Sequence, residues 1–154
     1  MNPAELITPE RIGLEADCSS KKRALETLAD LLVDGAADGL AASAAFEAMS
    51  AREKLGSTGL GHGVAIPHGR LAELDTPRIA VLRLDQGVDF EAMDHEPVDI
   101  LIALLVPEEA TSEHLDLLAQ LARGLSQPDT LAGIRRAADS AGVQQALTRA
   151  LGDT

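Results

Sequence analysis

The stretch DILIALLV, residues 99–106, is the segment on which the fold depends most directly. After its aspartate, the run from Ile100 to Val106 is apolar at every position. A strand with one exposed face alternates apolar and polar residues, whereas a strand covered on both faces is apolar throughout. The run is also far shorter than the roughly 20 residues that a membrane-spanning helix needs. It therefore predicts a β-strand buried on both faces of a sheet.

Other short apolar runs, bounded by Pro, Gly or Asp, predict two more strands: HGVAIP at 62–67 and RIAVLRL at 78–84. Helical periodicity appears on both sides of these runs. The predicted helices cover about residues 20–34, 40–54 and 111–126, a short segment opened by Pro128, and about 141–151. Helices at both ends with strands between them predict an α/β fold in which one sheet is packed between helices. With 154 residues and no linker or repeat, we expect a single domain over 1–154.

The first two helices have distinct apolar anchors. Leu25, Leu28 and Leu32 recur at helical spacing after the Ser19-Ser20 start, and Gly35 ends that segment. The alanine-rich second helix carries Phe46 and Met49 as its bulky residues and leads into a cluster of glycines. The first helix is therefore expected to lie at the surface with one buried stripe.

Charge and cysteine content limit the classes of function. The net charge is −12, from 13 basic and 25 acidic residues, which argues against nucleic-acid binding because that binding depends on Lys and Arg contacts to phosphates. The amino-terminal residues lack a basic start and an apolar signal core, so we expect no membrane insertion and a cytoplasmic protein. The single cysteine, Cys18, fits a reducing compartment.

The segment GSTGLGHGVAIPHGRL, residues 56–71, is the candidate functional motif. Gly56 and Gly61 have the spacing of a P-loop, but His62 and Gly63 stand where its lysine and hydroxyl residue belong. The dinucleotide fingerprint fails as well, because its third glycine would fall at Ile66 and because the cluster precedes the strand. Neither nucleotide motif is present.

A metal site is not predicted either. His62 and His68 lie six residues apart, too far along a strand for one ion, and the chain has no H-E-x-x-H motif. His95 and His114 show no ligand spacing. A zinc hydrolase is therefore the last of the alternatives.

His68 follows a proline, which fixes its own backbone and holds the preceding residue extended. This arrangement predicts a rigidly held histidine at the end of the 62–67 strand. Glycines before it leave backbone N–H groups open to close approach, and Ser57 and Thr58 add hydroxyl donors. The motif therefore predicts an anion pocket beside His68.

His114 points to the same region. If Ser112 caps the helix that follows, His114 falls in the first turn and within about 40° of Leu118, Leu121 and Leu125, on the buried stripe. The positive end of the helix dipole there favours a nearby anion. The alternative for His114 is a core histidine that is hydrogen-bonded to a carbonyl.

Three segments together resemble a known family. REKLGSTGLGHGVAIPHG (52–69) resembles the active-site segment of the IIA proteins of the bacterial phosphotransferase system, in the mannitol/fructose-type (type-2) class. PVDILIALLVP (97–107) followed by EHLDLLAQLA (113–122) resembles that family's buried strand and second-histidine helix. SKKRALETLADLL (20–32) is most similar to the nitrogen-regulatory branch, and the resemblance runs over about residues 6–137. It implies a mixed β-sheet flanked by helices on both sides.

The resemblance also implies roles for individual residues. His68 is implied as the phosphoacceptor, His114 as the second active-site histidine, and Arg52 as a residue facing the phosphate. Ser57 and Thr58 match the motif, and we infer for them a phosphate-binding role. For Arg52 the alternative is a solvated residue near a helix end. Metal and cofactor are not required, because phosphoryl transfer depends on positioning and charge stabilisation and the phosphate is carried covalently on His68.

Two other features of the basic and polar residues stay open. Position 62 departs from the family motif, and His62 is a candidate for a solvated group at the rim of the site. Lys21, Lys22 and Arg23 form a basic run at a helix start. That run is unfavourable to the helix dipole and is expected to be solvated surface, with an acidic partner as the alternative.

The leading hypothesis is a regulatory phosphocarrier, a component of a phosphotransferase system. It would take a phosphoryl group on His68 from the phosphohistidine of a small HPr-like carrier protein and bind regulatory partners according to its phosphorylation. Kinases and potassium transporters are candidate targets, and a monomer or weak homodimer is expected. The alternatives are a transport IIA protein that passes phosphate to a sugar-specific IIB protein, and an interaction module whose histidines are structural.

Overall fold

The computed structural model describes residues 2–15, 17–33, 40–72, 74–109 and 111–152. The strands in these ranges are β1 (Ile12–Glu15), β2 (Gly59–Gly61), β3 (Val64–Ala65), β4 (His68–Leu71), β5 (Arg78–Val88) and β6 (Val98–Pro107). The helices are α1 (Lys21–Val33), α2 (Ala42–Glu53), α3 (Ser112–Leu125), α4 (Pro128–Arg136) and α5 (Ser140–Leu151), with two short 3-10 helices, η1 (Pro3–Leu6) and η2 (Pro9–Arg11), before β1.

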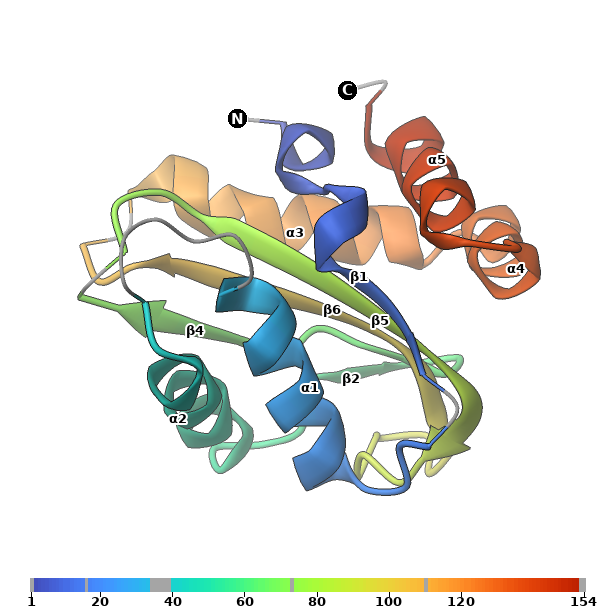
Figure 1. Cartoon of the computed structure of the whole chain (residues 1–154), viewed down its shortest axis with the longest axis horizontal. Helices are drawn as coiled ribbons and strands as arrows, with labels where there is room; N and C mark the ends of the chain where they lie inside the picture. Colours follow the sequence, from blue (N-terminus) through green and yellow to red (C-terminus); the bar gives the residue numbers. More distant parts are fainter. Residues whose placement is uncertain (1, 16, 34–39, 73, 110, 153–154) are drawn as a thin grey trace.

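The segment DILIALLV forms most of β6, which lies at the centre of the sheet (Figure 1). The strand order is β1-β5-β6-β3-β2, and β4 also pairs with β6. β5 runs antiparallel to β6, whereas β3 and β4 run parallel to it and β1 runs parallel to β5. The sheet is therefore mixed, as the family resemblance predicted.

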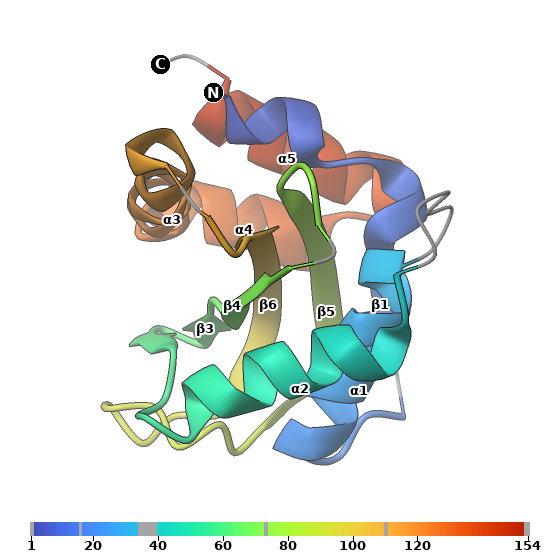
Figure 2. The ribbon, with the colours of Figure 1, turned by 90° about the vertical axis from the view of Figure 1, so that its left-hand side faces the viewer.

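Alternate residues of β6 belong to two different cores, because successive side chains of a strand point to opposite faces. Leu101, Ala103 and Leu105 pack on the side covered by α1 and α2. Ile100 and Ile102 pack on the other side, where residues of α3, α4 and α5 complete the core. Figure 2 shows these two layers of helices on opposite faces of the sheet. The prediction of a strand buried on both faces is confirmed.

β3 and β4 pair with β6 one after the other, along the same edge of that strand. Val64 is paired with Ile100 and His68 with Leu104, so the register is unchanged across the break between the two strands. At the break, the carbonyl of Pro67 still accepts a hydrogen bond from the amide of Leu104, at 2.9 Å. The predicted 62–67 strand was therefore wrong at both ends, because its first residues form a turn and pairing continues beyond His68.

The remaining predicted elements hold with small shifts. RIAVLRL lies in β5, which extends to Val88, and α1 to α5 occupy the predicted helical regions. The hydroxyl of Ser20 accepts a hydrogen bond from the amide of Arg23 and caps α1, as expected. The predicted stop at Gly35 lies outside the described residues. β1, β2, β4 and the two 3-10 helices were not predicted, because each has four residues or fewer and shows no periodicity of its own.

The turn between β2 and β3 is held from outside the sheet. His62 sits there with φ of 58°, between Gly61 and Gly63, whose φ values of 93° and 82° favour glycine. The Asp94 carboxylate accepts a hydrogen bond from the His62 amide at 3.0 Å, and Arg135 of α4 donates to the His62 carbonyl at 2.8 Å. Long-range contacts to polar side chains thus fix this turn.

A substitution at Gly69 tests how closely α2 approaches β4. A Cβ at Gly69 would lie 2.9 Å from the backbone carbonyl carbon and oxygen of Ala48 in α2. Because backbone atoms cannot move aside without shifting the helix, Gly69→Ala is expected to lower the free energy of unfolding by about 1–3 kcal/mol. Urea unfolding followed by circular dichroism measures this. Gly133→Ala is the control, since its Cβ would meet only a side-chain methyl at 3.3 Å; equal losses in the two variants would contradict the prediction.

A second prediction concerns pH. Backbone N–H groups of Glu96 and His62 donate to the Asp94 carboxylate and hold its pKa below its ordinary value. The ionised Asp94 carboxylate therefore stabilises the fold fully well above the unfolded-state pKa of about 3.9, and this stabilisation is lost as the pH falls below that value. At pH 7 the free energy of unfolding of wild type should exceed that of Asp94→Asn. This gap between the two proteins should close as the pH falls below about 4. Urea titrations at several pH values, with Asp85→Asn as an exposed control, measure the gap; a gap that widens in acid would refute the prediction.

Candidate functional site

His68 begins β4 and is half-buried. Its ring Nδ1 lies 2.9 Å from the carbonyl oxygen of Ile66. A carbonyl oxygen only accepts hydrogen bonds, so Nδ1 carries the proton in this arrangement. In the neutral ring, Nε2 then keeps its lone pair. A proline favours an extended backbone at the residue before it, so Pro67 restricts where the Ile66 carbonyl lies, and this carbonyl selects the tautomer whose Nε2 keeps the lone pair.

A hollow of about 500 Å³ opens beside His68, between α2, β4 and α3. Arg52 and His114 line it together with His68. A second hollow of about 430 Å³ adjoins it, shares Arg52 and His68, and reaches Ser57 and Thr58. The five residues singled out from the sequence therefore line two adjacent hollows with His68 and Arg52 common to both.

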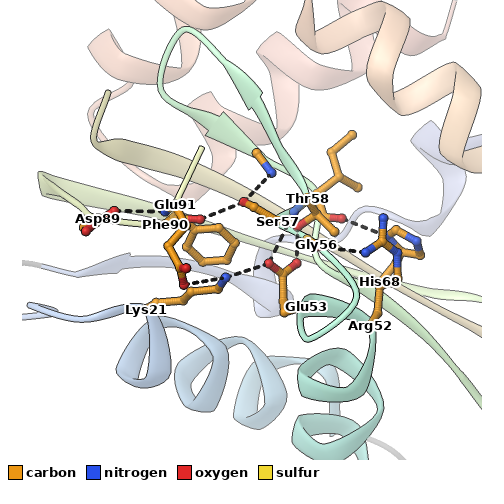
Figure 3. Close-up of polar contacts among 12 residues, drawn as sticks. Lys21, Arg52, Glu53, Gly56, Ser57, Thr58, His68, Asp89, Phe90 and Glu91 are labelled. Carbon is orange, nitrogen blue, oxygen red and sulfur yellow. Dashed lines mark hydrogen bonds and ion pairs between the residues drawn. The ribbon is translucent and has the colours of Figure 1, made fainter. Parts of the chain in front are cut away.

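Arg52 stands in the last turn of α2, where the chain leaves the helix toward the glycines. Its Nη1 donates a 2.8 Å hydrogen bond to the carbonyl of Gly56. Arg52 and His68 line both hollows, and Figure 3 shows the two side chains on the same side of the turn. A guanidinium has a planar set of N–H donors that matches phosphate oxygens, and one hydrogen bond to Gly56 leaves others available. Arg52 is thus a cation held at the mouth of the site by its own helix end.

His114 is the third residue of α3, and the helix is capped by Thr111 rather than by Ser112 as predicted. Thr111 Oγ1 accepts from the His114 amide at 3.4 Å, and the Thr111 amide donates to His114 Nδ1 at 3.3 Å. The side chain is half-buried, so it lies beside the buried stripe and not within it.

The two histidines are held in opposite tautomers. Because Nδ1 of His114 accepts a hydrogen bond, the proton of its neutral ring is on Nε2. His68 has the reverse arrangement, with its proton on Nδ1. An anionic group bonded to Nε2 of His68 would therefore find an N–H donor, and not a lone pair, on the neighbouring ring.

Ser57 and Thr58 use their hydroxyl protons within the protein. The Ser57 hydroxyl donates to the carbonyl of Phe90 at 2.7 Å and accepts from the amide of Gly59 at 3.1 Å. The Thr58 hydroxyl donates to the carboxylate of Glu53, and Thr58 is buried. These bonds hold the turn that lines the second hollow. A direct phosphate contact by either side chain remains a prediction.

Lys21 was wrongly expected to be solvated. Its Nζ lies 3.0 Å from Glu53 Oε1 and 4.7 Å from the centroid of the Phe90 ring. Lys22 and Arg23 are exposed, as expected. Sequence reasoning also missed Glu53, which is 8% exposed. No local signal in the sequence indicated its burial, which follows from the packing of α1 against α2.

His62 is exposed, as expected for a solvated group, but it lines neither of the two hollows at His68. Within the described ranges, no three His, Cys, Asp or Glu side chains lie close enough together to hold a metal ion. In those same ranges no helix has both the length and the apolar character needed to cross a bilayer.

Three leucines at the two hollows are exposed to solvent. Leu55 is 84% exposed, Leu115 is 53% exposed and Leu60 is 47% exposed. Leu55 and Leu115 line the hollow that holds His114, and Leu60 and Leu115 line the second one. These three exposed leucines, Leu55, Leu60 and Leu115, form an apolar rim at the hollows that His68 lines.

Comparison with known proteins adds to this geometry. Residues 5–150 match the family described as "Phosphoenolpyruvate-dependent sugar phosphotransferase system, EIIA 2". The chain is 48% identical over 133 residues to the nitrogen regulatory protein of Pseudomonas aeruginosa, which covers 86% of each chain. Its structure is similar to the crystal structure of nitrogen regulatory protein IIA-Ntr from Neisseria meningitidis, with a TM-score of 0.87 and 40% identity over 95% of this chain and 99% of that one.

The IIA mannitol protein of Escherichia coli shares the fold at lower identity, with a TM-score of 0.75 and 22% identity over 91% of this chain and 97% of that one. The mixed sheet between two helical layers is thus the fold of this group. With a profile match over most of its length and such identity to nitrogen regulatory proteins, the chain belongs to the EIIA 2 family of the phosphoenolpyruvate-dependent phosphotransferase system, among its nitrogen regulatory proteins.

Proposed function

We propose that this protein is a regulatory phosphocarrier of the cytoplasm. Nε2 of His68 accepts a phosphoryl group from the phosphohistidine of a small HPr-like protein, and the phosphorylated and free forms bind different regulatory partners. The observation that carries the proposal is the His68 ring itself. Its Nδ1–H donates a hydrogen bond to the Ile66 carbonyl, which leaves Nε2 with its lone pair in a hollow shared with Arg52 and His114.

The transfer balances without an added acid or base. The bond between phosphorus and the donor's imidazole nitrogen breaks as the bond between phosphorus and His68 Nε2 forms. Each ring keeps the proton on its other nitrogen, and the donor imidazole leaves with the electron pair of the broken bond. Positive charge grows on the His68 ring during attack, and the Ile66 carbonyl, whose oxygen accepts a hydrogen bond from Nδ1 at 2.9 Å, stabilises it.

The phosphoryl oxygens require positive charge and N–H donors. Arg52 supplies a guanidinium already oriented by the Gly56 carbonyl. His114 supplies an Nε2 proton from the first turn of α3, where the helix dipole also favours an anion. Preorganised donors of this kind act without the reorganisation that water would need, which is the main source of catalysis in phosphoryl transfer.

The apolar rim supports a protein as the phosphodonor. Leu55, Leu60 and Leu115 expose hydrocarbon around His68, and a small soluble donor would gain nothing from covering them. A carrier protein that inserts its phosphohistidine between them would bury this surface, at roughly 25 cal/mol per Å² of apolar area. The relatives' name, nitrogen regulatory protein, favours a regulatory output over sugar transport.

The main alternative is a transport IIA protein. One neighbour in fold is described as a complex of enzyme IIA mannitol with phosphorylated IIB mannitol. If this chain passed phosphate to a sugar-specific IIB protein, its phosphohistidine would be lost in a sugar-dependent way when that partner is added. Partners captured by the phosphorylated form only, or by the free form only, would instead support regulation.

Labelling tests the acceptor. With phosphoenolpyruvate, enzyme I and an HPr-like carrier, wild type should gain one phosphoryl group that is labile in acid and stable in alkali. His68→Ala should gain none, and Arg52→Ala should react roughly 100-fold more slowly because it loses a transition-state donor. Intact mass spectrometry over time follows the reaction. His95→Ala, an exposed histidine away from the hollows, is the control; labelling of His68→Ala at the wild-type rate would end the proposal.

A second experiment tests the apolar rim. Leu55→Gln removes exposed hydrocarbon and should raise the KM for the phosphorylated carrier protein by roughly 3- to 10-fold, since the change removes about 1 kcal/mol of burial. Phosphorylation by potassium phosphoramidate, a small donor that does not touch the rim, should stay at the wild-type rate. Met93→Gln, which changes an 89% exposed residue outside both hollows, is the matched control. An equal effect on both donors would argue against docking at this rim.

A further inference from the structure

Glu53 and Arg52 are neighbours in the last turn of α2, but their side chains leave the helix in different directions (Figure 3). Arg52 reaches the hollow at His68, whereas Glu53 turns inward and its side chain is 4% exposed. The Glu53 carboxylate accepts from the amide of Thr58 at 3.3 Å and from the Thr58 hydroxyl. The buried Glu53 carboxylate thus accepts hydrogen bonds from both the amide and the hydroxyl of Thr58, which lies in the turn after α2.

The charge of Glu53 is balanced by Lys21, the first residue of α1. The Nζ of Lys21 lies 3.0 Å from Glu53, 3.5 Å from Glu91 and 4.7 Å from the centre of the Phe90 ring. A carboxylate taken out of water is costly unless it is paired and hydrogen-bonded. Lys21 meets that requirement from a position where a helix start disfavours positive charge. Lys21 thus pairs with Glu53 at a position that is unfavourable for α1 itself.

The same turn also holds Arg52. Gly56, with φ of 145°, lets the chain reverse after α2, and its carbonyl accepts the Arg52 guanidinium at 2.8 Å. Two residues later, the amide of Thr58 donates a hydrogen bond to Glu53. Between them, the Ser57 hydroxyl is bonded to the carbonyl of Phe90, the residue whose ring lies under Lys21. The carbonyl that orients Arg52 is therefore part of a segment fixed on its inner side by the Lys21–Glu53 ion pair.

We propose that Glu53 and Lys21 are positioning residues for phosphoryl transfer: their ion pair fixes the turn at 56–58 and, through it, the guanidinium of Arg52 at His68. This inference rests on the proposed function of His68 as the acceptor. Neither residue touches the phosphoryl group. When the pair is broken, the turn gains alternative positions, the Gly56 carbonyl no longer holds Arg52 in one orientation, and attack at phosphorus loses a prepositioned cation.

The variants Glu53→Gln and Lys21→Met test the inference. Gln keeps the size of Glu and an oxygen that can accept from Thr58, and Met keeps an unbranched stem over the Phe90 ring, so each removes mainly the charge. Potassium phosphoramidate is the probe, because it removes any effect on carrier docking, and intact mass spectrometry measures the rate of phosphoryl gain. Each variant should react roughly 10- to 100-fold more slowly than wild type. Glu47→Gln and Lys22→Met, exposed residues of the same two helices, are matched controls and should react at the wild-type rate.

Coupling to Arg52 separates positioning from a general loss of structure. In an Arg52→Ala background there is no guanidinium to position, so Glu53→Gln should change the rate by less than about threefold. An equal slowing in both backgrounds would overturn the inference, and so would wild-type rates in Glu53→Gln and Lys21→Met. Circular dichroism at the assay temperature checks that each variant is folded. If wild type itself gains no phosphoryl group from either phosphoramidate or the carrier protein, the proposed function fails, whereas a labelled wild type with unaffected variants contradicts only the positioning role.

Discussion

Burial of β6 on both faces is the constraint on which the rest of the structure depends. Residues 100–106 are all buried, and their side chains alternate between two cores. A strand of this kind cannot lie at the surface, so a layer of helices must cover each side of it. It also offers both of its edges for pairing, to β5 on one side and to β3 and β4 on the other. His68 takes its place opposite Leu104 through that pairing, and α2 and α3, which carry Arg52 and His114, are the helices that flank the same edge.

The elements that could be predicted from sequence are those with a long apolar pattern. β5, β6, α1 and α3 carry such patterns, while the alanine content of α2 and the first-turn proline of α4 indicated those helices, and all were predicted to within a few residues. β2, β3 and β4 could not be delimited, because their ends depend on pairing with β6 and on the turn held by Asp94 and Arg135. These are contacts between residues far apart in the chain, and no local pattern reports them.

The residues of the candidate site likewise include some that the sequence predicts and some that it does not. The motif led to His68, while the helix pattern pointed to His114 and the family resemblance to Arg52, and the three side chains line one hollow. The helix cap at Thr111 was misplaced by one residue, since Thr and Ser are adjacent and both are good caps. The Lys21–Glu53 pair was missed altogether, because a lysine in a basic run and a glutamate at a helix end are solvated in most proteins. Only the packing of α1 against α2 makes them partners.

The hydrogen bonds that select the tautomers of His68 and His114 have a consequence for how this site can change over evolutionary time. In both cases the partner is a main-chain group, the carbonyl of Ile66 or the amide of Thr111. A main-chain partner is present whatever side chain occupies that position, so ordinary substitutions at 66 or 111 do not delete it. The surrounding surface can therefore change while the ring nitrogen of His68 that keeps its lone pair stays the same. Only changes that move the chain itself, at Pro67 or at the start of α3, would exchange the roles of the two nitrogens.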